Sequence, residues 1–134
     1  MKKGLLLIVM SLFLVSCGIN QNTVKHQKAQ KIKLENTSWK SIESVKGKVP
    51  TLQISNGKIH GNAGCNNYFG SLTINKATGL FSVGKLGVTK MACRNMKVEQ
   101  NFLQMLQKVD HYKIEEGILK LYHNKILILK FAQE

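Results

Sequence analysis

The sequence predicts an α+β domain: a curled antiparallel β-sheet, or cracked barrel, of about eight short strands with one α-helix. Two observations support this fold class. Short segments rich in alternating or β-branched apolar residues recur along the chain, separated by turn dipeptides such as Asn56-Gly57 and Glu116-Gly117. Only the segment between residues 95 and 109 instead spaces its apolar residues three and four positions apart, as an amphipathic helix does. A sheet curled around that helix is the simplest packing.

The first half of the domain contains only strand signals. Residues 39–45 predict a first strand anchored by the single tryptophan, and residues 51–55 predict a second strand because their apolar residues alternate. Further strands are expected at residues 58–60, 68–74 and 80–83, with a turn at residues 75–79. Residues 84–92 contain two glycines and no clear period, so they carry no assignment.

The second half begins with the helix. Asn95 is expected to cap a helix that runs to about Val109. Its apolar stripe, expected to face the core, consists of Val98, Phe102, Met105, Leu106 and Val109, and the polar side consists of Glu99, Gln100, Gln104, Gln107 and Lys108. Strands are then expected at residues 112–115, 118–122 and 125–131, with turns at Glu116-Gly117 and His123-Asn124.

The N-terminus has the pattern of a bacterial export signal. Residues 1–3 are Met-Lys-Lys, and the apolar run at residues 4–14 has the length of a signal-peptide core but is too short to span a bilayer. Residues 14–18, Leu-Val-Ser-Cys-Gly, resemble the lipobox of bacterial lipoproteins, which implies cleavage before Cys17 and lipid attachment to its thiol. An ordinary secretory signal, or an apolar first helix of a cytosolic protein, would be the alternatives.

These signals divide the chain into three parts. We expect a lipoprotein signal peptide at residues 1–16, a lipidated N-terminus and flexible tether at residues 17–33, and one domain at residues 34–134. Resemblance to Gram-negative lipoproteins implies, from Gly18, an outer-membrane location facing the periplasm. The membrane, reached through the lipid anchor, is therefore an expected partner.

The charge favours some partners over others. The formal net charge is +13, and Arg94 is the only arginine among 20 basic residues. Specific nucleic-acid readers rely on arginine for bidentate base contacts, and an exported protein meets little nucleic acid, so we expect no nucleic-acid partner. An anionic envelope polymer or lipid surface suits such a charge better. A merely solvating, lysine-rich surface is the alternative, because the lysines are spread along the whole chain.

Two motifs surround the two remaining cysteines. Residues 61–70 read Gly-Asn-Ala-Gly-Cys-Asn-Asn-Tyr-Phe-Gly, and residues 89–93 read Thr-Lys-Met-Ala-Cys. Together with the upstream tryptophan and the downstream helix, they resemble the META domain (HslJ-like) family over about residues 34–131. The family elements match at Gly64, Cys65, Asn66, Tyr68 and Gly70, and at Thr89, Met91, Ala92 and Cys93. Arg94 departs from the proline that many relatives carry. The resemblance implies one α+β domain and an envelope role in stress or antibiotic tolerance.

Cys65 and Cys93 most simply form a disulfide in an oxidising periplasm. Closing a loop of about 29 residues would add roughly 3–4 kcal/mol in the chain-entropy model. Two packed but unpaired thiols are the main alternative. A metal site is a weaker one, because there is no Cys-x-x-Cys pair and His60, His111 and His123 show no ligand spacing. A catalytic cysteine is weaker still, because nothing places His60 as its base. No metal or cofactor is expected.

Other residues could contact a ligand. Asn66 and Asn67 could present amides, and Tyr68 and Phe69 a flat apolar surface, although a structural turn is the simpler interpretation. The methionines near the helix could line an adaptable pocket, although core packing is again simpler. They are Met91, Met96 and Met105.

No catalytic constellation is recognisable in the sequence. We therefore expect a non-enzymatic envelope lipoprotein that binds an envelope component or another protein. The alternative is a pilotin-like assembly factor, which would need an apolar cavity inside a cracked barrel. A lysozyme-inhibitor-like lipoprotein is disfavoured, because a basic domain would be repelled by a basic lysozyme.

Overall fold

The computed structural model describes residues 33–134, so the expected signal peptide and Cys17 lie outside the described residues, as does all but the last residue of the expected tether. This part of the chain folds into nine strands and one helix. In order they are β1 (Thr37–Ser41), β2 (Thr51–Ser55), β3 (Lys58–Asn62), β4 (Asn67–Asn75), β5 (Leu80–Val83), β6 (Gly87–Val88), α1 (Met96–Lys108), β7 (His111–Glu115), β8 (Ile118–His123) and β9 (Ile126–Gln133).

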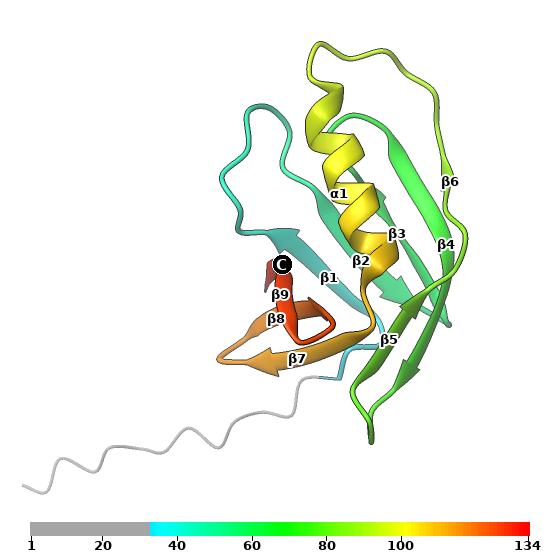
Figure 1. The fold of residues 1–134 in the computed structure, drawn as a ribbon. Coiled ribbons are helices and arrows are strands. Elements are labelled where there is room, and N and C mark those ends of the chain that lie inside the picture. The colour runs from blue at the N-terminus through cyan, green and yellow to red at the C-terminus, as the bar shows by residue number, and fades with distance from the viewer. Residues whose placement is uncertain (1–32) are drawn as a thin grey trace, which may run out of the picture.

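The strands form one antiparallel sheet that curls into a ring (Figure 1). The strand order is β3-β2-β1-β9-β8-β7-β5-β4, and the ring closes because β3 also pairs with β4. Its narrowest seam joins β5 to β7, where Leu80 pairs with His111. The short strand β6 adds to β4 alone. The predicted α+β class, with a curled antiparallel sheet and one helix, is confirmed.

Helix α1 lies inside the curl of the sheet and completes the core (Figure 1). Phe102 is at the centre, with its ring 5.6 Å from the ring of Tyr68 on β4 and 6.3 Å from that of Phe131 on β9. Trp39 of β1 is fully buried among them. Each such side chain contributes about 1.5–3 kcal/mol on burial, so helix and sheet depend on each other for stability.

Two strand boundaries need correction, and the segment without an assignment contains a further strand. Strand β1 ends at Ser41 rather than Val45, because the Ser41 N–H donates to the carbonyl of Pro50 (2.9 Å) and closes the intervening residues into a loop. Strand β9 begins at Ile126, because Lys125 belongs to the turn before it, with a φ of 71°. The unassigned segment, residues 84–92, contains β6. The other expected strands agree to within about two residues.

The helix has the predicted bounds to within one residue, but two details of the prediction are wrong. Asn95 makes no side-chain cap; its amide instead donates to the carbonyl of Lys46 (3.2 Å). Glu99 does not lie on the polar side, because it is only 5% exposed. Burial of a carboxylate needs hydrogen-bond partners, and these come from the first sequence motif.

Candidate functional site

The two family motifs meet at one end of the molecule. The first forms the turn between β3 and β4, and the second forms the connection from β6 to α1 (Figure 1). Asn66 is the centre of the contact and is 1% exposed. We call the contact between residues 62–67, residues 89–93 and Glu99 the motif junction.

Both polar atoms of the Asn66 side chain, the amide oxygen and the amide nitrogen, form hydrogen bonds within the motif junction. Its Oδ1 accepts from the Thr89 hydroxyl (2.9 Å) and from the Met91 N–H (2.7 Å). Its Nδ2 donates to the Met91 carbonyl (3.0 Å) and to Oε1 of Glu99 (3.1 Å). Thr89 also accepts from the Asn67 N–H (3.1 Å). The asparagine therefore holds the second motif in register with the first as a strand partner would.

Glu99 holds the helix to the same turn. Its Oε2 accepts from the Asn66 N–H at 2.7 Å, while its Oε1 accepts from the Asn66 side chain. Hydrogen bonds to a charged acceptor are stronger than neutral ones, and here both are buried. The spacing of Glu99, Phe102 and Leu106, three and then four residues, places all three on one face of α1. That spacing is the sequence signal that could have identified Glu99.

Asn62 and Gly64 shape the turn itself. Nδ2 of Asn62 donates to the Cys65 carbonyl (3.1 Å) and to Oδ1 of Asn67 (3.0 Å), and its Oδ1 accepts from the Gly64 N–H (3.0 Å). Gly64 has a φ of +112°, a conformation that favours glycine. Among residues 33–134, no buried side-chain nitrogen or oxygen lacks a partner. The two buried amides of the junction, those of Asn62 and Asn66, are thus engaged within the fold.

A disulfide joins Cys65 to Cys93 across the motif junction, with the two Cα atoms 6.1 Å apart. Because both sulfurs are bonded, neither is a thiolate that could attack a substrate or hold a metal. The described residues contain no group of three or more histidine, cysteine, aspartate or glutamate side chains suited to a metal ion.

Tyr68 and Gly70 extend the first motif into the sheet. Tyr68 is 1% exposed, its hydroxyl donates to the Thr51 carbonyl (2.8 Å), and burial raises its pKa well above the usual range. A Cβ at Gly70 would lie 2.8 Å from the Leu86 side chain, so glycine lets the β5–β6 connection cross β4. The expected flat apolar contact therefore falls to Phe69 alone, because Tyr68 is a core residue.

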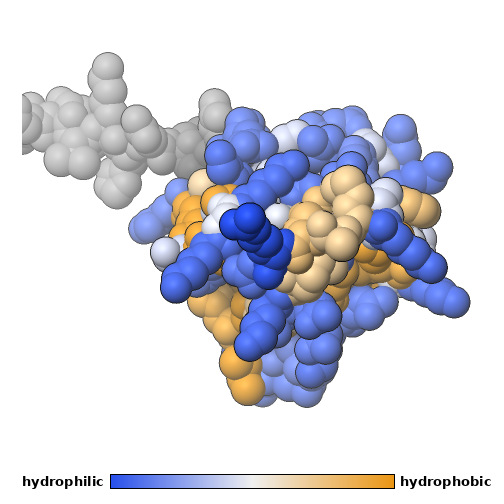
Figure 2. All heavy atoms as spheres, turned by 90° about the horizontal axis from the view of Figure 1, so that it is seen from above, coloured by the Kyte–Doolittle hydropathy of each residue, from blue (hydrophilic) through white to orange (hydrophobic). Residues whose placement is uncertain are grey.

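The exposed part of the junction comes mainly from the second motif, because residues 89–93 all lie at the surface. Met91 is 56% exposed and contributes mainly its backbone, while Ala92 is exposed beside it. Figure 2 looks down on this end of the molecule and shows an apolar patch surrounded by hydrophilic side chains. Met105 packs against the core, so the three methionines do not line one common pocket.

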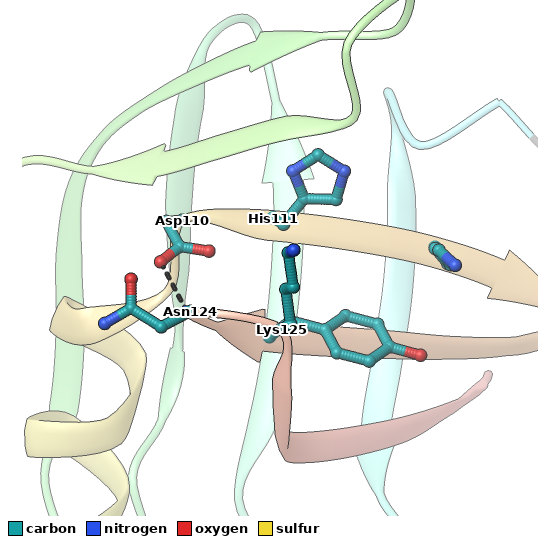
Figure 3. A pocket seen from close by; sticks show the side chains of 6 residues that line it. Asp110, His111, Asn124 and Lys125 are labelled. Carbon is teal, nitrogen blue, oxygen red and sulfur yellow. Dashed lines mark hydrogen bonds between the residues drawn. The ribbon is translucent and has the colours of Figure 1, made fainter.

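A second candidate site, absent from the sequence analysis, lies on the outer face of β7 and β8 (Figure 3). This basic pocket has a volume of about 650 Å³ and is lined by Asp110, His111, Lys113, Tyr122, Asn124 and Lys125. The Asp110 carboxylate accepts from the Asn124 N–H (2.8 Å), and its Oδ2 also lies 3.1 Å from Nδ1 of His123. No sequence signal marks the pocket, because strand pairing brings its residues together.

The family is decided by sequence comparison. A model of the META domain family matches residues 29–134. The chain belongs to the META domain family. A search of curated proteins returns no match. In the part of this META domain chain that the structure describes, no helix is both long enough and apolar enough to cross a membrane.

Two solved structures have a fold similar to that of this chain. An NMR structure of a protein from Burkholderia xenovorans shares 26% sequence identity with a TM-score of 0.64, over 75% of this META chain and 83% of that one. A second NMR structure shares 18% identity with a TM-score of 0.57, over 72% of this chain and 88% of that one. The second likeness concerns the fold only.

Proposed function

We propose that this META domain protein is a non-enzymatic envelope lipoprotein that acts by binding. The observation that carries the proposal is the motif junction. Its family-motif residues are used by the fold: Asn66 and Glu99 satisfy each other, and both cysteines are bonded. What remains for function is the surface, which is rich in lysine. A binding role is consistent with that surface.

In this role a lipid on Cys17 anchors the protein to the envelope, the domain lies in the periplasm, and Gly18 favours the outer membrane. Metabolic labelling with palmitate tests this anchor. The wild-type chain should incorporate label and Cys17→Ser should not. Label that persists in Cys17→Ser would overturn the lipoprotein assignment.

The binding role is proposed to support stress or antibiotic tolerance, with an envelope protein or an anionic envelope polymer as partner. A photo-crosslinking residue at Phe69, which is 60% exposed on β4, tests it in cells under envelope stress. Specific capture from Phe69, and none from a crosslinker at exposed Gln53 on β2, is expected. A turnover activity that depends on one domain residue would contradict the non-enzymatic role.

A pilotin-like escort role would need an apolar cavity inside the ring. The centre of the ring is instead filled by Trp39, Phe81 and Phe131, each fully buried. A groove of about 340 Å³ runs between the β1–β2 loop and α1, but it lies outside this packed centre. The packing therefore favours recognition at the outer surface over transport of a partner in the interior.

A further inference from the structure

We propose that the basic pocket and the adjoining tip of the β8–β9 hairpin form a docking surface for an anionic phospholipid layer. Lipid phosphates would enter the pocket, and Ile126 and Leu127 would enter the apolar edge of the headgroup region. This inference rests on the proposed envelope location and names the membrane itself as the partner of this face.

The pocket offers cations that the protein does not neutralise. Lys120 pairs with Glu115 (2.6 Å) and Lys130 with Glu43 (3.6 Å). Across residues 33–134, by contrast, no carboxylate lies within ion-pair distance of the pocket's two lysines, Lys113 and Lys125. Two uncompensated ammonium groups in one concavity suit a phosphate better than a neutral ligand.

The other pocket residues add shape and orientation. In Figure 3, Lys125 extends up to β7, the strand that carries His111, and the His111 ring itself lies beside Gly79. The Lys113 Nζ lies 5.9 Å from the centre of the Tyr122 ring. Tyrosine is enriched at the level of lipid headgroups, where its ring meets apolar chains and its hydroxyl meets water. Asp110, the one acid in the pocket, is already engaged by the Asn124 N–H.

The backbone of Lys125 supplies an independent argument. In the β2–β3 and β7–β8 turns, the second residue with positive φ is glycine, namely Gly57 and Gly117. In the β8–β9 turn the same place is taken by Lys125, whose φ is 71°. A side chain there is strained, and glycine would relieve the strain. Strain retained at an exposed turn points to a function for the side chain.

Apolar side chains lie directly beside these cations. Ile126 is 67% exposed and Leu127 40% exposed, immediately after Lys125. Strand pairing places Leu127 opposite Tyr122, Tyr122 opposite His111, and His111 opposite Leu80. Directly paired residues project from the same face of a sheet. The row across the three strand pairs therefore has an apolar side chain at each end, Leu127 and Leu80, and the amphipathic side chains of Tyr122 and His111 at its centre. Exposed apolar residues among lysines are typical of surfaces that lie against anionic lipid.

The expected tether makes the contact accessible. Because Lys33, where the described domain begins, follows Cys17 by only 16 positions, a lipid on Cys17 would keep the domain close to the lipid surface. At such an effective concentration, a weak contact is sufficient for docking.

Amide hydrogen exchange of the full chain, reconstituted in vesicles, tests the surface. Vesicles of phosphatidylcholine are compared with vesicles containing about one third phosphatidylglycerol. We expect the amides of residues 123–127 to exchange about fivefold more slowly with the anionic lipid, and the protection to disappear in about 0.5 M salt. The amides of β2 should not change.

Matched variants separate docking from folding. Lys113→Gln should reduce the protection about fivefold, whereas Lys58→Gln, an equal loss of charge on an exposed position of β3, should not. Lys125→Gly should reduce the protection by a similar factor while raising the melting temperature, because strain is relieved. A folding defect would lower the melting temperature, so it cannot explain a loss of protection that is accompanied by a higher melting temperature. Ile126→Ser should remove the protection completely, so that residues 123–127 exchange at the same rate with both kinds of vesicle.

Two results would overturn the inference. One is protection that is unchanged in both Lys113→Gln and Lys125→Gly. The other is protection of the same amides by free glycerol phosphate but not by anionic vesicles, which would assign the pocket to a soluble phosphate ester. Neither result depends on palmitate labelling of Cys17, so the docking surface and the proposed lipoprotein anchor can fail separately.

Discussion

Glu99→Gln should destabilise the domain by about 2–3 kcal/mol. The two Glu99 oxygens accept from the Asn66 N–H at 2.7 Å and from Asn66 Nδ2 at 3.1 Å. Glutamine keeps only one acceptor oxygen, so its NH₂ group would face either the Asn66 N–H or Asn66 Nδ2, and both of these are donors. Asn66 cannot rotate to correct this, because its Oδ1 already accepts from Thr89 and Met91. Losing a charge-assisted bond costs about 1.5–3 kcal/mol, and losing a carboxylate in the first helical turn adds about 0.3–1 kcal/mol. Relief of the buried charge offsets part of that sum.

Urea unfolding of Glu99→Gln, Asn66→Ala and the double variant measures the effect as a double-mutant cycle. The melting temperature of Glu99→Gln should fall by about 10–20 °C. The double variant should be more stable than the sum of the single effects predicts, by about 1–2 kcal/mol, because the opposed donors are no longer both present. Gln104→Glu, an exposed change on the same helix, should have little effect. A loss below about 0.5 kcal/mol, or strict additivity, would refute the described role of the junction.

Three further outcomes are expected. Cys65→Ser combined with Cys93→Ser should lower the free energy of unfolding by about 3–4 kcal/mol, and wild-type protein under reducing conditions should match it in denaturant unfolding. Gly61→Ala should prevent folding or cost more than about 3 kcal/mol in thermal unfolding, because its Cβ would overlap the backbone of β2, whereas Gly117→Ala, with open space around it, should cost only about 1 kcal/mol. Burial raises the pKa of Tyr68, so the folded state retains a proton that the unfolded state loses, and stability should fall by about 1.4 kcal/mol per pH unit above about pH 10. Tyr68→Phe should lack that part of the alkaline loss in unfolding measured at several pH values.

The sequence predicts the elements of this fold better than their connections. Leu52 and Ile54 alternate with polar neighbours and are both buried in β2, as the period of a half-buried strand requires. The local pattern of apolar residues does not predict the loop after Ser41. That loop is closed instead by the hydrogen bond from the Ser41 N–H to the Pro50 carbonyl, which lies nine residues further along the chain. Local patterns describe neighbours, whereas a sheet is completed by residues that are distant in the chain.

The candidate sites show the same division. The two motifs identify Asn66 from the sequence, but its partner Glu99 lies 33 residues away and looks like a surface residue by type. The basic pocket carries no motif at all, because Lys113 and Tyr122 become neighbours only when β7 pairs with β8. Residue type alone favours solvent for a lysine or a glutamate, and only the tertiary structure decides which of them is used.

The position of β9 has a consequence for how the chain reaches its native state. This strand pairs with β1 on one side and β8 on the other, so Trp39, from the start of the domain, lies opposite Gln133. During synthesis, residues 33–125 can form hairpins but cannot close the ring, because β9 is the strand that joins β1 to β8. The cooperative folding step therefore awaits the arrival of β9, the last strand of the domain.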